Sequence, residues 1–219
     1  RASTYESDLT HGAAFMRFDN GTWAVGVTGS LYGGQIDSNR TVTVGALTGV
    51  AQGSTDGEGQ SISAGVSRRF RLDGDTLLAL GAETTASRIN LDGFTETGAG
   101  GLSLEVSAQS RAWLTTVISG RINRTYRLNG RDFGLYGGLG AMLTSGDRQT
   151  LADMRFSGAA IGFGDFTVEG AETAPVAGLA DIGFEAEVSD NAVVSLGYRG
   201  VFNERLDDHQ VGARIQIRW

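Results

Sequence analysis

The chain contains the stretch VGARIQIRW at residues 211–219, in which apolar and polar or small side chains alternate without a break. A strand places successive side chains on opposite faces, so this alternation predicts a β-strand with one apolar and one polar face. The apolar positions are Val211, Ala213, Ile215, Ile217 and Trp219, and the positions between them include Arg214, Gln216 and Arg218. The expected fold must therefore place guanidinium groups opposite a face of aliphatic side chains.

The composition fits a strand-rich chain of one domain. The 219 residues include 34 Gly, 1 Pro and no Cys, which excludes a disulfide framework and a thiolate metal site. All 18 basic residues are Arg, and the 25 Asp and Glu give a formal net charge of −7, which argues against nucleic-acid binding. Because no apolar run approaches the ~18 residues of a membrane-spanning helix, a membrane location would require a β-barrel.

Tight turns and long connections alternate along the chain. Asn-Gly and Asp-Gly pairs supply the positive φ angles of tight hairpins, and alternating segments flank them. The predicted tight turns are Asn20-Gly21, Asp73-Gly74, Asn129-Gly130 and Asp190-Asn191, and the predicted long loops are 37–50, 91–101, 146–166 and 204–209. Short turns on one rim and long loops on the other are typical of an outer-membrane barrel.

Between these boundaries we predict nine strands. Their predicted ranges are 10–18, 22–36, 51–72, 76–90, 102–128, 132–146, 166–188, 192–204 and 210–219. Alternation alone does not decide which face is outside, and a soluble barrel would place its aliphatic face inside. A bacterial single-chain barrel normally has an even number of strands, so either one strand is miscounted or the chain lacks its first strands. The start at Arg1, without Met or a targeting segment, favours the second explanation.

Several stretches resemble the carboxy-terminal translocator barrel of autotransporters, the type V secretion proteins of Gram-negative bacteria. They are FTVEGA (166–171), SDNAVVSLGYRGVF (189–202) and HQVGARIQIRW (209–219), in this order and spacing. Two earlier stretches, GSTDGEGQSISAGVSRRFRL (53–72) and RINLDGFTETGAGGLSLEVSAQSR (88–111), are similar to the subgroup whose passenger is a GDSL-type esterase or lipase.

The resemblance implies an all-β fold, a transmembrane antiparallel up-and-down β-barrel. The family's barrel has twelve strands, is threaded by a helix and follows a secreted passenger. Aligned from its end, the chain would be one partial barrel domain over residues 1–219 that supplies strands four to twelve. The linker helix, the first three strands and the passenger are then expected to be absent from the sequence.

Within such a barrel the two faces of the strands acquire roles. Val211, Ala213, Ile215, Ile217 and Trp219 would face lipid, and the terminal aromatic resembles the signal read by the outer-membrane assembly machinery. Charged residues would line the lumen, because an Arg facing lipid costs about 2–4 kcal/mol at the bilayer midplane. The expected lumen-lining residues are Arg17, Arg69, Glu83, Glu105, Arg111, Arg121, Asp181, Glu185, Arg199, Arg214 and Arg218.

The function predicted from the sequence is a non-enzymatic anchor and translocator that exports a passenger through a polar lumen in the outer membrane. The expected partners are membrane lipid, the barrel assembly machinery and the chain's own passenger, with the barrel acting as a monomer and binding no nucleic acid. Alternatives are a barrel enzyme of esterase, phospholipase or protease type, using His209 beside Asp207 and Asp208, and an eight-stranded porin or adhesin with residues 1–10 as a tail.

Other motifs in the sequence are weak indications of chemistry. GDTL at 74–77 places Thr76 where the GDSL motif has its nucleophilic serine, and it falls in a predicted hairpin turn. His11 and His209 are the only histidines. We therefore expect no catalytic residues, cofactor or metal in this chain.

Overall fold

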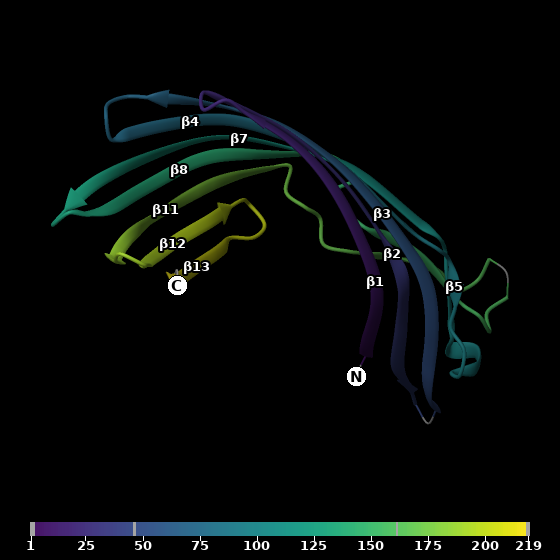
Figure 1. Cartoon of the computed structure of the whole chain (residues 1–219). Helices are drawn as coiled ribbons and strands as arrows, with labels where there is room; N and C mark the ends of the chain where they lie inside the picture. The colour runs from purple at the N-terminus through teal and green to yellow at the C-terminus, as the bar shows by residue number, and fades with distance from the viewer. Residues whose placement is uncertain (1–2, 46, 161, 218–219) are drawn as a thin grey trace.

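The computed structural model describes residues 3–45, 47–160 and 162–217, and most of its regular structure is β-strand. Nine antiparallel strands form one sheet in which each strand pairs with its neighbours in chain order. The sheet curls into a half-barrel with β1 and β13 at its edges (Figure 1). Its strands are β1 (Ser3–Asp19), β2 (Trp23–Val44), β3 (Leu47–Arg71), β4 (Thr76–Leu91), β7 (Gln109–Leu128), β8 (Arg131–Gly146), β11 (Val176–Ser189), β12 (Ala192–Phe202) and β13 (Asp208–Ile217). The predicted all-β, up-and-down fold with nine barrel strands is confirmed.

Tight turns join the strands at one end of the sheet, at the predicted positions. In the first turn, the Asn20 side-chain carbonyl accepts hydrogen bonds from the backbone N–H groups of Thr22 and Trp23, at 3.1 and 2.8 Å. In the third, Asn129 and Gly130 both have positive φ, 51° and 81°, as a two-residue hairpin of type I′ requires. Local sequence therefore sets this rim of the sheet.

One predicted loop proves to be strand. Residues 37–50 were expected to form a long connection, but β2 continues to Val44, β3 starts at Leu47, and the turn between them includes Gly45 with φ 59°. Alternating Thr and Val at 41–44 favour the extended chain. The strands of this hairpin contain 22 and 25 residues, more than twice the ~10 that cross a bilayer. Its far end therefore extends beyond a membrane, which accounts for its polar composition.

The two longest connections between sheet strands contain a second, four-stranded sheet. It has the order β10-β9-β6-β5, and a 3₁₀ turn (η1, Gly100–Leu102) precedes β6. The predicted strands 102–128 and 166–188 are each divided accordingly. The strands of the small sheet are β5 (Phe94–Thr95), β6 (Leu104–Val106), β9 (Leu151–Phe156) and β10 (Asp165–Glu169).

The small sheet is attached to the β2–β3 hairpin by a largely buried ion pair. Arg40 Nε donates to Glu96 Oε1 at 3.0 Å, and the Glu96 side chain is only 6% exposed. The Leu104 backbone N–H donates to the other Glu96 oxygen at 2.9 Å. Ala51 of β3 is fully buried beside this contact region, and Val42 is nearly so. These contacts fix the small sheet at the loop end of the half-barrel.

The nine-stranded sheet does not enclose an apolar core. Among the described residues, no large side chain is fully buried, whereas Val211, Leu139 and Ile182 are 75%, 74% and 62% exposed. The part of the chain that the structure describes contains no helix long and apolar enough to cross a membrane. The distribution of apolar surface is thus the reverse of that in a water-soluble sheet protein, where burial of such side chains drives folding.

Candidate functional site

Strand register assigns each side chain of the large sheet to one of two faces. Residues directly opposite one another share a face, and Arg121, Gly138, Asp181 and Arg199 form one such row across β7, β8, β11 and β12. Because side chains alternate along each strand, this row defines a polar face for the whole sheet. The expected lumen residues on the polar face are Arg17, Arg69, Glu83, Arg111, Arg121, Asp181, Glu185, Arg199 and Arg214.

The opposite, apolar face carries most of the exposed aliphatic residues of the strands, although a few, such as Leu9, lie on the polar face. Along residues 60–68 of β3, apolar-face positions are exposed and polar-face positions are half-buried, as expected when the polar face is the concave side. Exposed residues of the apolar face include Met16, Val25, Val27, Leu31, Ile62, Val66, Leu80, Leu114, Ile118, Ile122, Leu139, Leu143, Val176, Ile182 and Leu196.

The residues expected to form the membrane anchor lie on the apolar face. Val211, Ile215 and Ile217 are 75%, 69% and 55% exposed there, and Ala213 shares their face. Trp219, which was expected to complete this anchor, lies outside the described residues. Arg218, expected in the lumen, lies outside them too.

Charged side chains of the polar face form ion pairs that bridge over an intervening strand. Arg69 of β3 donates to both carboxylate oxygens of Asp19 on β1, at 2.8 and 2.7 Å, and Ala24 of β2 lies opposite Asp19 between them. Arg121 of β7 lies 2.9 Å from Asp181 of β11. Two arginines of the polar face are therefore paired with carboxylates of the same sheet.

Tyr136 on β8 fills a depression in the polar face that sequence analysis did not identify. A side-chain carbon added at Gly183 or Gly197 would collide with the Tyr136 hydroxyl, so the ring lies over these two glycines. The Arg121 guanidinium lies 4.1 Å from the Tyr136 ring centroid. Glycines within these strands have no side chain, and they therefore leave room for an aromatic ring to lie on the sheet.

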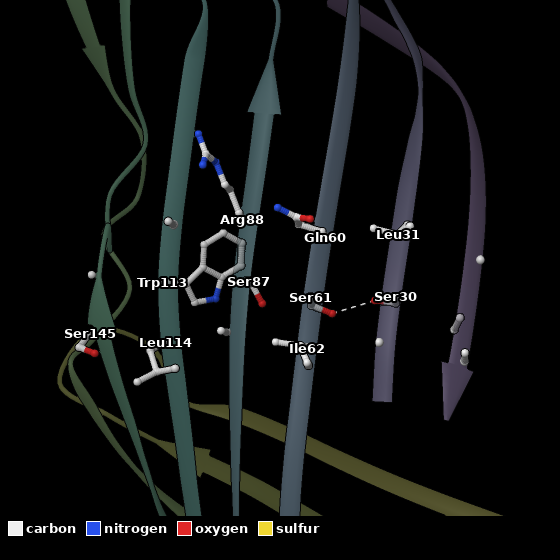
Figure 2. A pocket seen from close by; sticks show the side chains of 17 residues that line it. Ser30, Leu31, Gln60, Ser61, Ile62, Ser87, Arg88, Trp113, Leu114 and Ser145 are labelled. Carbon is white, nitrogen blue, oxygen red and sulfur yellow. Dashed lines mark hydrogen bonds between the residues drawn. The ribbon is translucent and has the colours of Figure 1, made fainter. Parts of the chain in front are cut away.

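A row of small side chains crosses the polar face farther toward the long loops. Ala13, Ser30, Ser61 and Ser87 lie opposite one another, and the row ends at Trp113. The Ser30 and Ser61 hydroxyls are 2.7 Å apart in a hydrogen bond, and the Trp113 indole lies beside Ser87 (Figure 2). A hollow of about 1070 Å³ is lined by this row and by its chain neighbours. The sheet thus presents a low surface here, made of small side chains with three serine hydroxyls among mainly apolar atoms.

Arg111 fastens the long connection after β8 to β7. Its guanidinium donates to the Asp147 carbonyl at 2.7 Å and to the Thr150 and Thr173 hydroxyls at 3.3 and 3.4 Å. It also lies 5.1 Å from the Trp113 ring centroid. Arg111 was expected to line the lumen. The structure places it on the polar face, at the end of the sheet where the long loops begin.

Glu105 is not on the large sheet. It lies in β6 of the small sheet and accepts a hydrogen bond from Arg155 at 2.5 Å. This bond holds the pKa of the Glu105 carboxyl below its ordinary value. The alternation around Glu105 continues that of β7, but residues 107–108 separate the two strands, and this interruption is what directs Glu105 away from the barrel wall.

The residues considered for an enzyme do not form a catalytic arrangement in the described structure. Thr76 of GDTL is 6% exposed, and its hydroxyl donates to Asp73 within the tight turn at 3.0 Å. His209 Nδ1 is 2.8 Å from the Tyr198 hydroxyl, on the apolar face, while His11 lies on β1 at the opposite edge of the sheet. Within the described ranges there is no group of three or more His, Cys, Asp or Glu able to hold a metal.

Comparison with known proteins gives one family and one fold. The family model of the autotransporter beta-domain matches residues 1–199. The solved translocator domain of autotransporter NalP from Neisseria meningitidis matches with a TM-score of 0.64 and 15% identity, covering 100% of this chain and 70% of that chain. A search of curated proteins finds no match.

Proposed function

Because the chain belongs to the autotransporter beta-domain family, we propose that residues 1–219 form part of the wall of an outer-membrane translocator barrel that exports an amino-terminal passenger. The observation that carries this function is the reversed polarity of the sheet. Its concave face holds ion pairs and hydroxyls, and its convex face holds exposed aliphatic side chains. In the outer membrane of a Gram-negative bacterium the convex face contacts acyl chains and the concave face lines water.

The polar face suits passage of an extended chain. An unfolded passenger exposes apolar side chains, and aliphatic residues on the lumen wall would retain them. Here the row from Ala13 to Ser87 offers small and hydroxyl side chains, and charges such as Arg121 and Asp181 neutralise each other. The barrel therefore contributes a hydrated path for the passenger.

The last strand supports a role in assembly. The apolar stripe of β13 is highly exposed at Val211, Ile215 and Ile217, and the sequence continues to Trp219. The exposed aliphatic stripe of this edge strand fits a surface that the barrel assembly machinery binds and that then anchors the barrel in the membrane. Lipid and the assembly machinery are accordingly the proposed partners besides the passenger.

Closure of the barrel requires more chain than the nine strands. Within the described residues, β1 pairs with β2 alone and β13 with β12 alone. Open sheet edges are not tolerated in hydrocarbon, because each unsatisfied backbone group costs several kcal/mol there. Further strands pairing with these edges, together with a linker helix, would complete the domain. A GDSL-type esterase is the proposed passenger, from the resemblance of residues 53–72 and 88–111.

The export function is tested by crosslinking, and residues 1–219 contain no cysteine that would compete with an introduced one. In the full-length protein, Ser61→Cys places a thiol on the polar face and Ile62→Cys places one on the apolar face of the same strand. With a passenger halted in transit and carrying a cysteine, Ser61→Cys is expected to form a disulfide with it, and Ile62→Cys is not. Equal crosslinking from both positions, or none from Ser61→Cys while export proceeds, would refute the proposed path.

A further inference from the structure

A seven-residue pattern occurs twice in the chain, each time at the end of a strand that enters a tight turn. RRFRLDG at 68–74 ends β3, and RTYRLNG at 124–130 ends β7. Each copy has an Arg, an aromatic residue two positions later, a second Arg, a Leu and the turn pair. The two strands are separated by β4 alone, so they lie about 10 Å apart across the sheet, at the ~4.8 Å spacing of neighbouring strands. Along the strands the copies are offset by four residues, because the β7 residue level with Arg68 is Gly120, four positions before Arg124.

The first arginine of each copy lies on the apolar face, unlike the lumen arginines. Arg68 is opposite Leu80 and Arg124 is opposite Leu135, and both are exposed. A charge at the centre of that face would be costly in lipid. Each of these arginines instead lies five positions before the first turn residue, Asp73 or Asn129, and hence near the rim.

Aromatic rings hold both guanidinium groups against the sheet. The Arg68 guanidinium carbon lies 4.7 Å from the Phe70 ring centroid and 5.2 Å from that of Trp23. The Arg124 carbon lies 5.2 Å from the Tyr126 ring centroid. These distances are within the range of cation–π attraction. Stacking fixes the plane of a guanidinium and leaves its edge, with the N–H donors, free to bind a ligand.

The surroundings fit the phosphate of a lipid headgroup. The nearby Asp73 carboxylate attracts Arg124 electrostatically, but its oxygens already accept hydrogen bonds from the Asp75 and Thr76 N–H groups and the Thr76 hydroxyl. Leu78 and Ile122 share the apolar face between the two arginines, where an acyl chain would lie. Tight turns of such barrels are periplasmic, which places the pair at the inner leaflet, and aromatic residues favour this interfacial depth.

We propose that Arg68 and Arg124, with Phe70, Trp23 and Tyr126, form two binding positions for the phosphate of an anionic phospholipid in the periplasmic leaflet. The inference rests on the proposed outer-membrane function, which supplies the lipid. Each arginine near a membrane surface changes affinity for anionic lipid roughly fivefold, so loss of both corresponds to about 30-fold. Two fixed positions two strands apart would also set the depth of the barrel wall in the leaflet.

The test measures binding of phosphatidylglycerol to the full-length protein in neutral detergent, with phosphatidylcholine as the reference lipid. Arg68→Gln with Arg124→Gln is expected to weaken phosphatidylglycerol binding about 30-fold and to leave phosphatidylcholine binding nearly unchanged. The matched control, Arg71→Gln with Arg127→Gln, removes the same charge from the same two repeats on the polar face, and it is expected to retain wild-type affinity. Equal weakening by both pairs, or by neither, would overturn the proposal.

A second variant keeps the test valid if the first does not fold. Phe70→Leu with Tyr126→Leu retains both charges and removes the stacking, so binding is expected to weaken severalfold; unchanged binding contradicts the aromatic part of the site. Folding is checked by the altered gel mobility of unheated barrels. Surface display of the passenger is expected to continue in the Arg68→Gln, Arg124→Gln variant, so loss of the lipid sites and failure of export are separate results.

Discussion

Replacing two adjacent residues of β7 by arginine tests the polarity of the sheet directly. Ile118 is 54% exposed on the apolar face, opposite Ala82 and Ala141. Ser119 follows it on the polar face and is also exposed. Both positions lie in the middle of a 20-residue strand, so the variants Ile118→Arg and Ser119→Arg differ in the direction of the new side chain and hardly in depth.

The expected difference in stability is large because only one of the two arginines meets lipid. An Arg on the lipid face near the midplane costs about 2–4 kcal/mol, which lowers the folding equilibrium constant about 30- to 700-fold at 1.4 kcal/mol for each tenfold change. An Arg in the hydrated lumen resembles an ordinary surface substitution, with a change within about 0.5 kcal/mol. In water alone, both exposed sites would show only this small change.

The assay is guanidinium unfolding of the full-length protein in phosphatidylcholine vesicles, followed by tryptophan fluorescence. Ile118→Arg is expected to lower the free energy of unfolding by about 2–4 kcal/mol, and Ser119→Arg is expected to leave it near the wild-type value. Ile118→Leu serves as the control for loss of the native side chain. If Ser119→Arg is the more damaging variant, or if the two are equal, the assignment of faces is wrong and the translocator function fails with it.

Two further predictions concern parts outside the membrane. Arg40→Ala leaves the buried Glu96 carboxylate unpaired, and breaking such a pair costs about 3–5 kcal/mol. We therefore expect proteases added to intact cells to cleave within residues 92–108. Unchanged protection from cleavage would show that the pair does not hold the small sheet. Hydrogen bonds from the Asp75 N–H and from Thr76 lower the pKa of Asp73 in the folded protein. The ionised Asp73 carboxylate therefore stabilises the fold at pH values above about 3.9, the pKa of Asp in the unfolded chain, and this stabilisation is lost as the pH falls through the lower folded pKa. Asp73→Asn is expected to remove this part of the acid dependence of the unfolding midpoint, and an identical acid dependence in both proteins would contradict it.

The strand pattern and turn chemistry were sufficient to predict the large sheet. Alternation is a local property, and the turn pairs at 20–21, 73–74 and 129–130 define one rim without reference to the rest of the chain. The faces of Arg121 and Asp181 followed from the same alternation. Sequence analysis therefore predicted the features that depend on residues adjacent in sequence, namely the strands, their two faces and the tight turns.

The features that sequence analysis missed depend on contacts between distant segments. The small sheet joins residues 94–106 to residues 151–169, and neither short strand carries a signal that specifies its partner. The loop predicted at 37–50 was wrong because polar composition was taken to indicate a loop, whereas a strand with both faces in water is polar as well. The Tyr136 ring over Gly183 was missed because three separate strands create that depression.

Ion pairs that bridge over a strand connect the curvature of the sheet to its polarity. Arg121 and Asp181 sit two strands apart, which is about 10 Å in a flat sheet, yet their charged atoms are 2.9 Å apart. The strand between them contributes Gly138, where an added side-chain carbon would collide with Asp181. Side-chain tips converge on a concave face and diverge on a convex one, so pairs of this kind form on the inside of a curled sheet and resist its flattening. The residues that make the concave face polar therefore also help to curve the sheet.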